Sequence, residues 1–315
     1  MTLNNIQQFK NTIIVPKVMG KVLFNSNMSS LTWLKTGGEA KVFYSPLDLT
    51  DLKIFLTKLD KKIAIYVLGG GSNTLFRDLG FNGVVIKLSK KFDYLNIINE
   101  KKIKVGAATN CIKLARVLAN KGIGGLEFLS GIPGTVGGAI RMNAGAYGKE
   151  TSNFLEEIKV INRNGEIKTI LAKEYVMNYR QTNFPKSYLF LEAIFSCKER
   201  DKKENLNIIT KLNSKRKLTQ PITEKTSGSS FKNPKKLKAW KLIEDSGCRD
   251  YKEGDACISS IHANFIVNKG NATSSNIEKL GEIIKGKVLE KFGIELIWEI
   301  QIIGKKENNL SGNNA

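Results

Sequence analysis

The sequence predicts an α+β protein with more than one domain. Segments with helical spacing of apolar residues alternate with short apolar runs that are typical of strands. Asn164-Gly165 separates two such runs in 155–171, and this pair is a strong β-hairpin signal, since Asn and Gly both accept positive φ. At 315 residues the chain can form one large domain or two to three smaller ones. A polar, lysine-rich stretch at 198–207 interrupts the pattern, so we expect a domain boundary near residue 205.

Helix ends are indicated by caps and glycines. Asn110 is expected to cap one helix and Gly122 to end it, while Ser275 and Glu278 have capping-box spacing before a helix that stops at Gly293. The expected helices cover 47–62, 110–122, 205–218, 235–247 and 274–293. Besides the hairpin, strands are expected at 63–69, 81–88, 101–109, 187–198 and 294–303. In the last of these, strict alternation places Ile294, Leu296, Trp298, Ile300 and Ile302 on one face.

Composition narrows the class of protein. The formal charge is +21, but only 8 of the 50 basic residues are arginine, the residue that reads bases and clamps phosphates best. We therefore expect no nucleic-acid partner. The four cysteines lack CxxC spacing, and the single histidine, His262, excludes a His-rich metal site. No apolar run is long enough for a signal peptide or a membrane span, so a cytoplasmic protein without membrane attachment is expected.

Two glycine-rich segments each follow a strand-like run, LGGGSNTLF at 68–76 and GIPGTVGGAIRMNAGAYG at 131–148. Glycine lets backbone amides approach an anion closely, so the pair predicts direct binding of a pyrophosphate without a metal; two tight turns are the alternative. No GxGxxG motif supports a Rossmann site. GEIIKGKV at 281–288 matches GxxxxGK, but it has valine where a P-loop needs Ser or Thr and lies inside an expected helix.

Six blocks occur in the order and spacing of one family: YVLGGGSNTLFRD, GLEFLSGIPGTVGGAIRMNAGAYG, NYRQTNF, GSSFKNP, SSIHANFIVN and WEIQIIG. Over residues 20–304 the chain resembles the UDP-N-acetylenolpyruvoylglucosamine reductases, flavoenzymes of bacterial peptidoglycan synthesis. The resemblance implies a vanillyl-alcohol-oxidase/PCMH-type FAD-binding fold of two lobes plus a C-terminal α+β substrate-binding domain. The corresponding segments are 1–88 for the first lobe, 89–205 for the second lobe, 206–303 for the substrate domain and 304–315 for a disordered tail.

The resemblance also implies the cofactors. FAD would be bound non-covalently, because neither loop has His or Cys beside it, and NADPH would be the hydride donor. Side-chain-poor backbone would wrap the pyrophosphate from two sides, and the segment from Asn143 would line the flavin. The implied FAD contacts are Gly69, Gly70, Gly71, Ser72, Asn73, Thr74, Gly131, Pro133, Gly134, Thr135, Gly137, Gly138, Ala139, Asn143, Ala144, Gly145 and Ala146.

By the same resemblance, Arg180 stabilises negative charge on the substrate carboxylate and Ser229 protonates the substrate carbon. Glu299 is implied to assist charge stabilisation or proton delivery. The alternatives are purely structural: an ion pair for Arg180, a turn position for Ser229 and a solvent-facing strand position for Glu299. Ser230 remains a rival to Ser229. Candidate substrate contacts are Lys225, Lys232 and Asn233, and His262 is either a structural residue or a further contact.

The segment between Arg180 and Ser229 is short, so the chain resembles the subclass that lacks the inserted tyrosine loop. The implied reaction is NADPH-dependent reduction of UDP-N-acetylglucosamine enolpyruvate to UDP-N-acetylmuramate. Two rival functions remain: an FAD-dependent oxidase of the same fold acting on an alcohol or sugar, and a basic nucleic-acid-binding protein whose glycines form turns. No obligate protein partner is expected.

Overall fold

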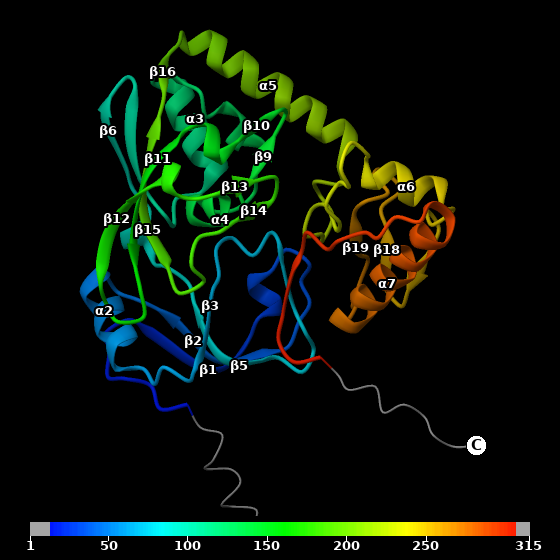
Figure 1. The fold of residues 1–315 in the computed structure, drawn as a ribbon, viewed down its shortest axis with the longest axis horizontal. Helices are drawn as coiled ribbons and strands as arrows, with labels where there is room; N and C mark the ends of the chain where they lie inside the picture. The colour runs from blue at the N-terminus through cyan, green and yellow to red at the C-terminus, as the bar shows by residue number, and fades with distance from the viewer. Residues whose placement is uncertain (1–12, 307–315) are drawn as a thin grey trace, which may run out of the picture. The chain divides into compact units, whose positions relative to one another are not determined.

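The computed structural model of the chain describes residues 13–306. Its largest sheet has five strands in the order β12-β11-β15-β7-β6, each antiparallel to its neighbours. Helices α3 (Cys111–Asn120) and α4 (Val136–Arg141) pack beside this sheet (Figure 1). The five strands are Ile167–Leu171, Leu155–Ile161, Leu189–Ser196, Lys102–Gly106 and Leu95–Asn99.

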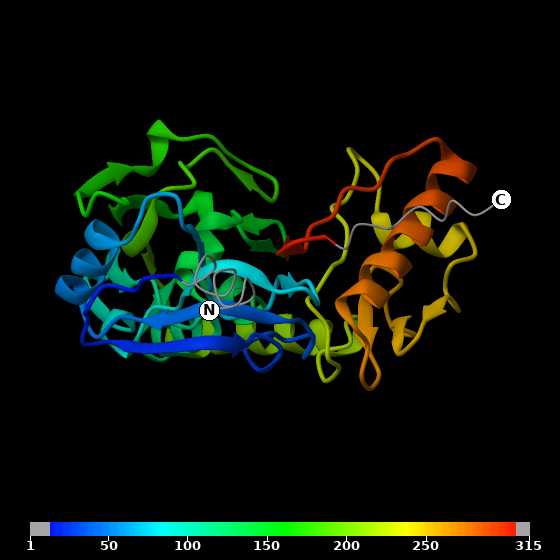
Figure 2. The same ribbon diagram turned by 90° about the horizontal axis from the view of Figure 1, so that it is seen from below.

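A second sheet has four strands in the order β1-β2-β5-β3, with β3 parallel to β5. Figure 2 shows β1 and β2 running side by side in dark blue. Helix α2 (Leu49–Lys58) begins at Asp48, whose side chain accepts a hydrogen bond from the Asp51 backbone N–H, and it packs the Phe55 ring on Tyr44. The four strands are Lys21–Asn27, Glu39–Ser45, Phe81–Ile86 and Ala64–Val67.

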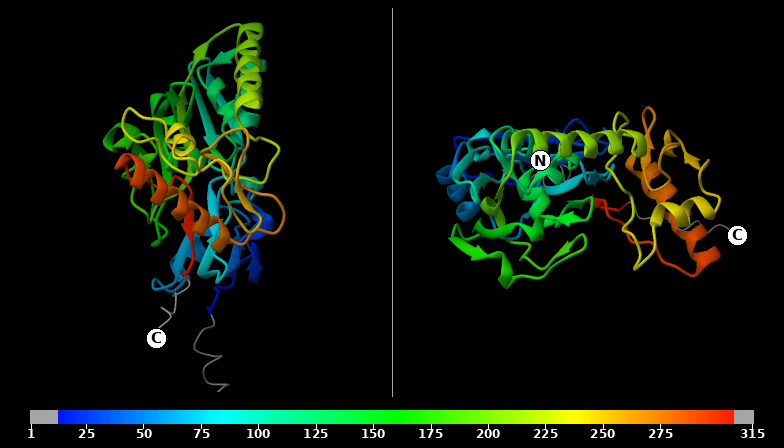
Figure 3. Two further views of the ribbon diagram at one scale, coloured as in Figure 1. Left: turned by 90° about the vertical axis from the view of Figure 1, so that its right-hand side faces the viewer. Right: turned by 90° about the horizontal axis from the view of Figure 1, so that it is seen from above.

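The long helix α5 (Lys202–Thr219) is seen along its length in the right panel of Figure 3. Asp201 caps its first turn, and Asn205 and Ile209 are its buried residues. The helix passes residue 205 without interruption. The polar sequence at 198–207 therefore contains a short strand, β16 (Lys198–Glu199), followed directly by a helix start.

The C-terminal part contains helices α6 (Ala239–Asp245) and α7 (Ser274–Phe292) and a sheet of β17, β18 and β19. Strand β20 (Gln301–Ile303) pairs in parallel with β4 (Thr74–Phe76), far away in the sequence. The strands of this three-stranded sheet are β17 (Lys252–Glu253), β18 (Ala256–Ile258) and β19 (Ile266–Asn268). The other short strands, which lie earlier in the chain, are β8 (Ile123–Gly124), β9 (Gly145–Ala146), β10 (Lys149–Glu150), β13 (Met177–Asn178) and β14 (Gln181–Thr182). Short 3-10 helices are Ser29–Leu31, Lys90–Phe92, Glu127–Gly131, Thr151–Asn153 and Ala172–Glu174.

The described residues divide into two compact units. The first comprises 13–24, 42–70 and 83–220, and the second comprises 25–41, 71–82 and 221–306. The first unit has two apolar cores, one centred on α3 and the five-stranded sheet and one on α2. The second unit has one core, to which α6, α7 and residues 294–302 contribute. The lobes expected at 1–88 and 89–205 stay a prediction, and the tail expected at 304–315 lies outside the described residues except for 304–306.

Three local expectations are wrong in detail. The hairpin over 155–171 forms, but only Gly165 has positive φ, so its turn is longer than the two-residue type expected for Asn-Gly. Helix α7 is capped by a Thr273–Asn276 capping box instead of Ser275–Glu278. Within 294–303 only the last three residues join a strand ladder, although Leu296 and Ile300 are buried as their alternation predicted.

Candidate active site

The two glycine-rich loops contact each other in the first unit. A Cβ atom at Gly70 would lie 2.7 Å from the Gly134 Cα atom, and one at Gly69 would lie 2.8 Å from the Thr135 hydroxyl oxygen. Side chains are therefore excluded at both positions by the neighbouring loop. The sequence interpretation assigned this close approach to a ligand alone, whereas part of it comes from the protein itself.

Lys87 supports the first loop, and no sequence pattern had singled it out. Its Nζ donates a hydrogen bond to the Gly69 carbonyl oxygen at 3.0 Å, and burial lowers the pKa of this ammonium group. A neighbouring anion would stabilise its charged form. The only feature of the sequence that could have pointed to Lys87 is its position directly after the apolar run GVVI. Neither loop contains Asp or Glu, so a lysine-supported, glycine-lined surface without carboxylates fits the FAD pyrophosphate.

The rest of the first loop, from Gly71, belongs to the second unit. The Gly71 carbonyl accepts a hydrogen bond from the Trp33 N–H, and Thr74 is buried in β4. Asn73 binds the C-terminal segment twice: its Nδ2 donates to the Glu299 carbonyl at 3.0 Å, and its carbonyl accepts from the Gln301 N–H at 3.0 Å. This loop and the C-terminal segment therefore hold each other in place.

The second loop forms α4 and the turn that follows it. Thr135 caps α4 by accepting from the Gly138 N–H at 3.3 Å. Asn143 is fully buried, with its side-chain amide hydrogen-bonded inside the protein. Ala139 is also buried, and the other expected FAD contacts of this loop are half-buried: Gly131, Pro133, Gly134, Thr135, Gly137, Gly138, Ala144, Gly145 and Ala146.

Arg180 lies in the first unit, at the turn of the short hairpin formed by β13 and β14. It has φ +53°, a left-handed conformation that is uncommon for a long side chain. Its Nη2 donates to the Gly145 carbonyl oxygen at 2.8 Å, and its guanidinium lies 5.1 Å from the centre of the Tyr179 ring. The arginine is thus bound to the second glycine-rich loop.

Ser229 and Ser230 lie in the second unit and have different surroundings. Ser230 is wholly buried, and its hydroxyl oxygen accepts from the Ile266 N–H at 3.1 Å. Ser229 is half-buried. Asn264, which sequence reasoning missed, fixes this segment: its carbonyl accepts from Ser230 N, while its side chain bonds both backbone groups of Phe231 at 3.0 and 2.8 Å.

Glu299 is joined by its backbone to both neighbouring segments. Its N–H donates to the Ser230 carbonyl at 2.8 Å, and its carbonyl accepts from Asn73. The second unit therefore brings together the Ser229 segment, Glu299 and the end of the first loop.

The comparisons with known proteins agree with this arrangement. Residues 44–171 match the model of an FAD binding domain, and residues 220–303 match that of the UDP-N-acetylenolpyruvoylglucosamine reductase C-terminal domain. The reductase of Rickettsia akari is 43% identical over 293 residues, covering 93% of this chain and 99% of that protein, and the reductase of Orientia tsutsugamushi (strain Ikeda) is 44% identical over 297 residues, covering 93% and 98%.

The chain belongs to the UDP-N-acetylenolpyruvoylglucosamine reductase family. The crystal structure of the Thermus caldophilus reductase, 31% identical, superposes with a TM-score of 0.79 and covers 91% of this chain and all of that one. The predicted PCMH-type FAD-binding fold with a C-terminal domain is confirmed. The chain is an FAD- and NADPH-dependent oxidoreductase of peptidoglycan precursor synthesis, and the alternative of an oxidase is set aside.

The expected substrate contacts of this reductase all lie in the second unit. Lys225 donates to the Gly270 carbonyl at 3.3 Å, and the backbone N–H of Lys232 donates to the Ile297 carbonyl at 2.8 Å. The side-chain oxygen of Asn233 accepts from the Ala239 N–H at the start of α6. His262 accepts from the Asn264 N–H through Nδ1, and burial lowers its pKa, so this ring is neutral at pH 7.

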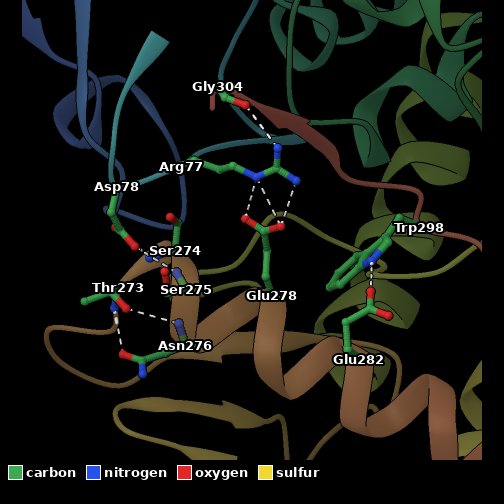
Figure 4. Close-up of polar contacts among 10 residues, drawn as sticks. All are labelled: Arg77, Asp78, Thr273, Ser274, Ser275, Asn276, Glu278, Glu282, Trp298 and Gly304. Atoms are coloured by element: carbon green, nitrogen blue, oxygen red, sulfur yellow. Dashed lines mark hydrogen bonds and ion pairs between the residues drawn. The ribbon is translucent and has the colours of Figure 1, made fainter. Parts of the chain in front are cut away.

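Helix α7 and β4 hold the C-terminal segment of the reductase, as Figure 4 shows. Arg77, directly after β4, forms a bidentate ion pair with Glu278 at 2.9 Å and donates to the Gly304 carbonyl at 3.0 Å. The indole N–H of Trp298 donates to Glu282 at 3.0 Å. These contacts fix both ends of the stretch that contains Glu299.

Two further properties concern residues 13–306 only. In that range no three His, Cys, Asp or Glu side chains gather where they could hold a metal ion. None of the helices there is both long and apolar enough to cross a membrane.

Proposed function

We propose that this reductase acts on UDP-N-acetylglucosamine enolpyruvate through Arg180, Ser229 and Glu299. Support comes from one observation on the residues themselves. Arg180 and Glu299 are each hydrogen-bonded to a glycine-rich loop, Arg180 to Gly145 and Glu299 to Asn73. The Arg180 guanidinium and the Glu299 backbone, which lie more than a hundred residues apart in the sequence, are thus both tied to loops that fit FAD.

The reaction places clear demands on these residues. The chemistry that bound FAD supplies is hydride transfer, from NADPH to the terminal methylene carbon of the enolpyruvyl group. Negative charge develops on the neighbouring carbon and spreads into the substrate carboxylate. The Arg180 guanidinium stabilises that charge, and an electrostatic donor of this kind is worth about 10²–10³ in kcat. Glu299 assists charge stabilisation or proton delivery.

Ser229 is the acid that completes the reduction. Its hydroxyl proton moves to the carbon next to the carboxylate, and the alkoxide left behind is reprotonated from solvent. Serine is a weak acid, but a carbanion held in contact with it is basic enough to take the proton. We assign this role to Ser229 and not to Ser230, because the Ser230 hydroxyl is wholly buried and holds the Ile266 N–H, whereas Ser229 is only half-buried.

We assign Lys225, Lys232 and Asn233 to the substrate's diphosphate and sugar, and we place the reaction in the cytoplasm. The described cysteines, Cys111, Cys197, Cys248 and Cys257, are all free thiols, as is usual in a reducing compartment. The substrate of this chain is a small molecule.

The test uses the purified protein, its flavin spectrum and NADPH consumption with and without the enolpyruvyl nucleotide. We expect bound flavin and substrate-dependent NADPH oxidation, which Arg180→Ala and Ser229→Ala reduce by about 10²–10⁴-fold. Retention of near-normal turnover in Ser229→Ala, with loss of turnover in a folded Ser230→Ala, would reverse the serine assignment. Rapid oxygen consumption with an alcohol, independent of the enolpyruvyl nucleotide, would overturn the proposed substrate assignment.

A further inference from the structure

The end of α4 and the loop that follows it are joined at three points to the hairpin that carries Arg180. Arg180 binds Gly145 through its guanidinium. Asn143 Nδ2 donates to the Asn178 carbonyl at 3.1 Å, and the Thr182 hydroxyl donates to the Arg141 carbonyl at 2.9 Å. Asn178 and Thr182 flank the turn on either side, so one arm of the hairpin is held by the loop after α4 and the other by the last residue of α4.

Both polar atoms of the Asn143 side chain are already hydrogen-bonded inside the protein. Its Nδ2 donates to Glu150 at 2.8 Å as well as to Asn178, and its Oδ1 accepts from the Ser152 N–H at 2.9 Å. An asparagine amide offers two donor hydrogens and one acceptor oxygen, and all three groups are used. Because the residue is fully buried at φ +41°, losing any of these bonds would strand a polar group inside the protein.

The hairpin needs such support. β13 and β14 contribute only two residues each, and an isolated two-stranded hairpin is at best marginally stable in water. The turn also contains the left-handed Arg180, a backbone state that adds strain. After the hairpin, the guanidinium of Arg141 donates to the carbonyls of Phe184, Pro185 and Tyr188 at 3.1, 3.2 and 2.6 Å, so the outgoing chain is anchored to the end of α4.

We propose that Asn143 and Thr182 are positioning residues that set the place of Arg180 for the reaction. The proposal rests on the proposed catalytic role of Arg180. It gives the side chain of Asn143, expected from sequence to line the flavin, a role toward the hairpin. Since Asn143 and Gly145 belong to the loop that is expected to line the flavin, one segment serves both the cofactor and Arg180.

The test separates the two half-reactions of the FAD-loaded enzyme. Asn143→Gly removes the side-chain bonds and tolerates the left-handed backbone; Thr182→Val is a milder, isosteric loss of one bond. We expect the substrate-dependent return of the flavin's visible absorbance to slow by about 10–100-fold in Asn143→Gly and by about 3–10-fold in Thr182→Val, since a shift near 1 Å costs about 10²-fold. In Thr182→Val, the reduction of the flavin by NADPH and the Kd for FAD should change less than threefold.

A second readout does not depend on activity. Amide hydrogen exchange over residues 177–188 of the FAD-free protein should speed up in both variants, because the hairpin loses its anchors. Asn178→Ala is the matched control: its side chain is exposed and only its carbonyl accepts from Asn143, so both readouts should stay at wild-type values.

Three outcomes decide the matter. If both half-reactions slow equally, or exchange and reoxidation stay unchanged in both variants, the positioning role is overturned. If Arg180→Lys itself keeps the wild-type reoxidation rate, the proposed function of Arg180 fails first, whatever the Asn143 variants do. If flavin reoxidation slows in Arg180→Lys but stays at the wild-type rate in both Asn143→Gly and Thr182→Val, this inference alone is overturned and the proposed role of Arg180 stands.

Discussion

Ser229 and Ser230 are identical neighbours with different surroundings. The Ser230 hydroxyl is out of contact with water and serves the backbone of β19 through Ile266. The Ser230 backbone also joins Asn264 and Glu299. Ser229 is half-buried, and its hydroxyl is the one to which the proposed function assigns the proton transfer.

This difference predicts that alanine substitutions at the two serines change the stability of the protein by different amounts. Ser230→Ala leaves the Ile266 N–H without its acceptor, and such a loss costs about 1–3 kcal/mol of unfolding free energy. Ser229→Ala should change the unfolding free energy by no more than about 0.5 kcal/mol. Urea unfolding of the two variants measures this directly. A destabilised Ser229→Ala beside an unaffected Ser230→Ala would contradict the assignment.

At the scale of single elements, the N-terminus of α7 is satisfied by two different segments. Thr273 accepts from the Asn276 N–H at 3.0 Å, while the carboxylate of Asp78 accepts from the Ser274 and Ser275 N–H groups at 2.9 and 2.8 Å. The free amides of a first turn need such acceptors. Asp78 follows β4, so the cap joins the helix to the strand that pairs with β20.

Asp78 should make stability depend on pH. Burial alone would raise the pKa of its carboxyl, but the hydrogen bonds from Ser274 and Ser275 outweigh it and the net pKa is lowered. A lowered folded-state pKa stabilises the protein above the unfolded value, near 3.9, and this contribution disappears as the pH falls through the folded value.

We therefore expect Asp78→Asn to lose about 1 kcal/mol of unfolding free energy at pH 7, by analogy with other capping residues. The difference from wild type should shrink as the pH falls below about 4. Urea unfolding at a series of pH values provides the measurement. A difference that grows toward low pH would contradict the sign.

Two glycines in α7 offer a matched pair. A Cβ atom at Gly281 would lie 2.1 Å from the Trp298 ring, whereas one at Gly286 would meet nothing within 4 Å. Gly281→Ala should destabilise the protein by about 1–3 kcal/mol through overpacking. Gly286→Ala should stabilise it by about 0.5–1 kcal/mol, the ordinary helix-propensity gain. Thermal unfolding of both variants checks the prediction, and similar shifts for the two would refute it.

For α7 and the segment after it, sequence patterns predicted only the features that depend on residues close together in the chain. The stop of α7 at Gly293 follows from its left-handed φ, and the burial of Leu296 and Ile300 follows from alternation. The choice of Thr273 over Ser275 as cap does not, because both have suitable spacing to a polar residue. It is decided by Asp78, nearly two hundred residues earlier in the chain.

For the whole molecule, the same limit separates what was foreseeable from what was not. The glycine loops and the matching blocks predicted FAD, which the FAD-binding family model confirms, and roles for Arg180, Ser229 and Glu299 that stay predictions. Lys87, Asn264 and the bonds of Asn143 were not foreseen, because each acts on a carbonyl or amide of a distant segment and leaves no spacing signal of its own. The contact between Gly70 and Gly134 likewise needed the folded chain.

Binding of FAD should stabilise the folded protein as a whole. A ligand that binds only the folded state adds RT ln(1 + [L]/Kd), which is about 2.7 kcal/mol when free FAD is 100 times its Kd. The thermal midpoint should therefore rise with FAD concentration, as differential scanning calorimetry of the FAD-free protein can show. Riboflavin, which lacks the pyrophosphate, is the control and should give a much smaller shift. An equal shift with riboflavin would mean that the glycine loops do not grip the diphosphate.

The parallel pairing of β4 with β20 also has a consequence during synthesis. Arg77 and its partner Gly304 are 227 residues apart, so at about 5–20 residues per second a ribosome needs roughly 10–45 s between them. Leu34 and Leu75 belong to the core of the second unit, and during that interval they lack core neighbours that are synthesised late, such as Leu296 and Ile300. The nascent chain therefore exposes this apolar surface until residues 296–304 have been synthesised, so we expect chaperone access and translation speed to affect the yield.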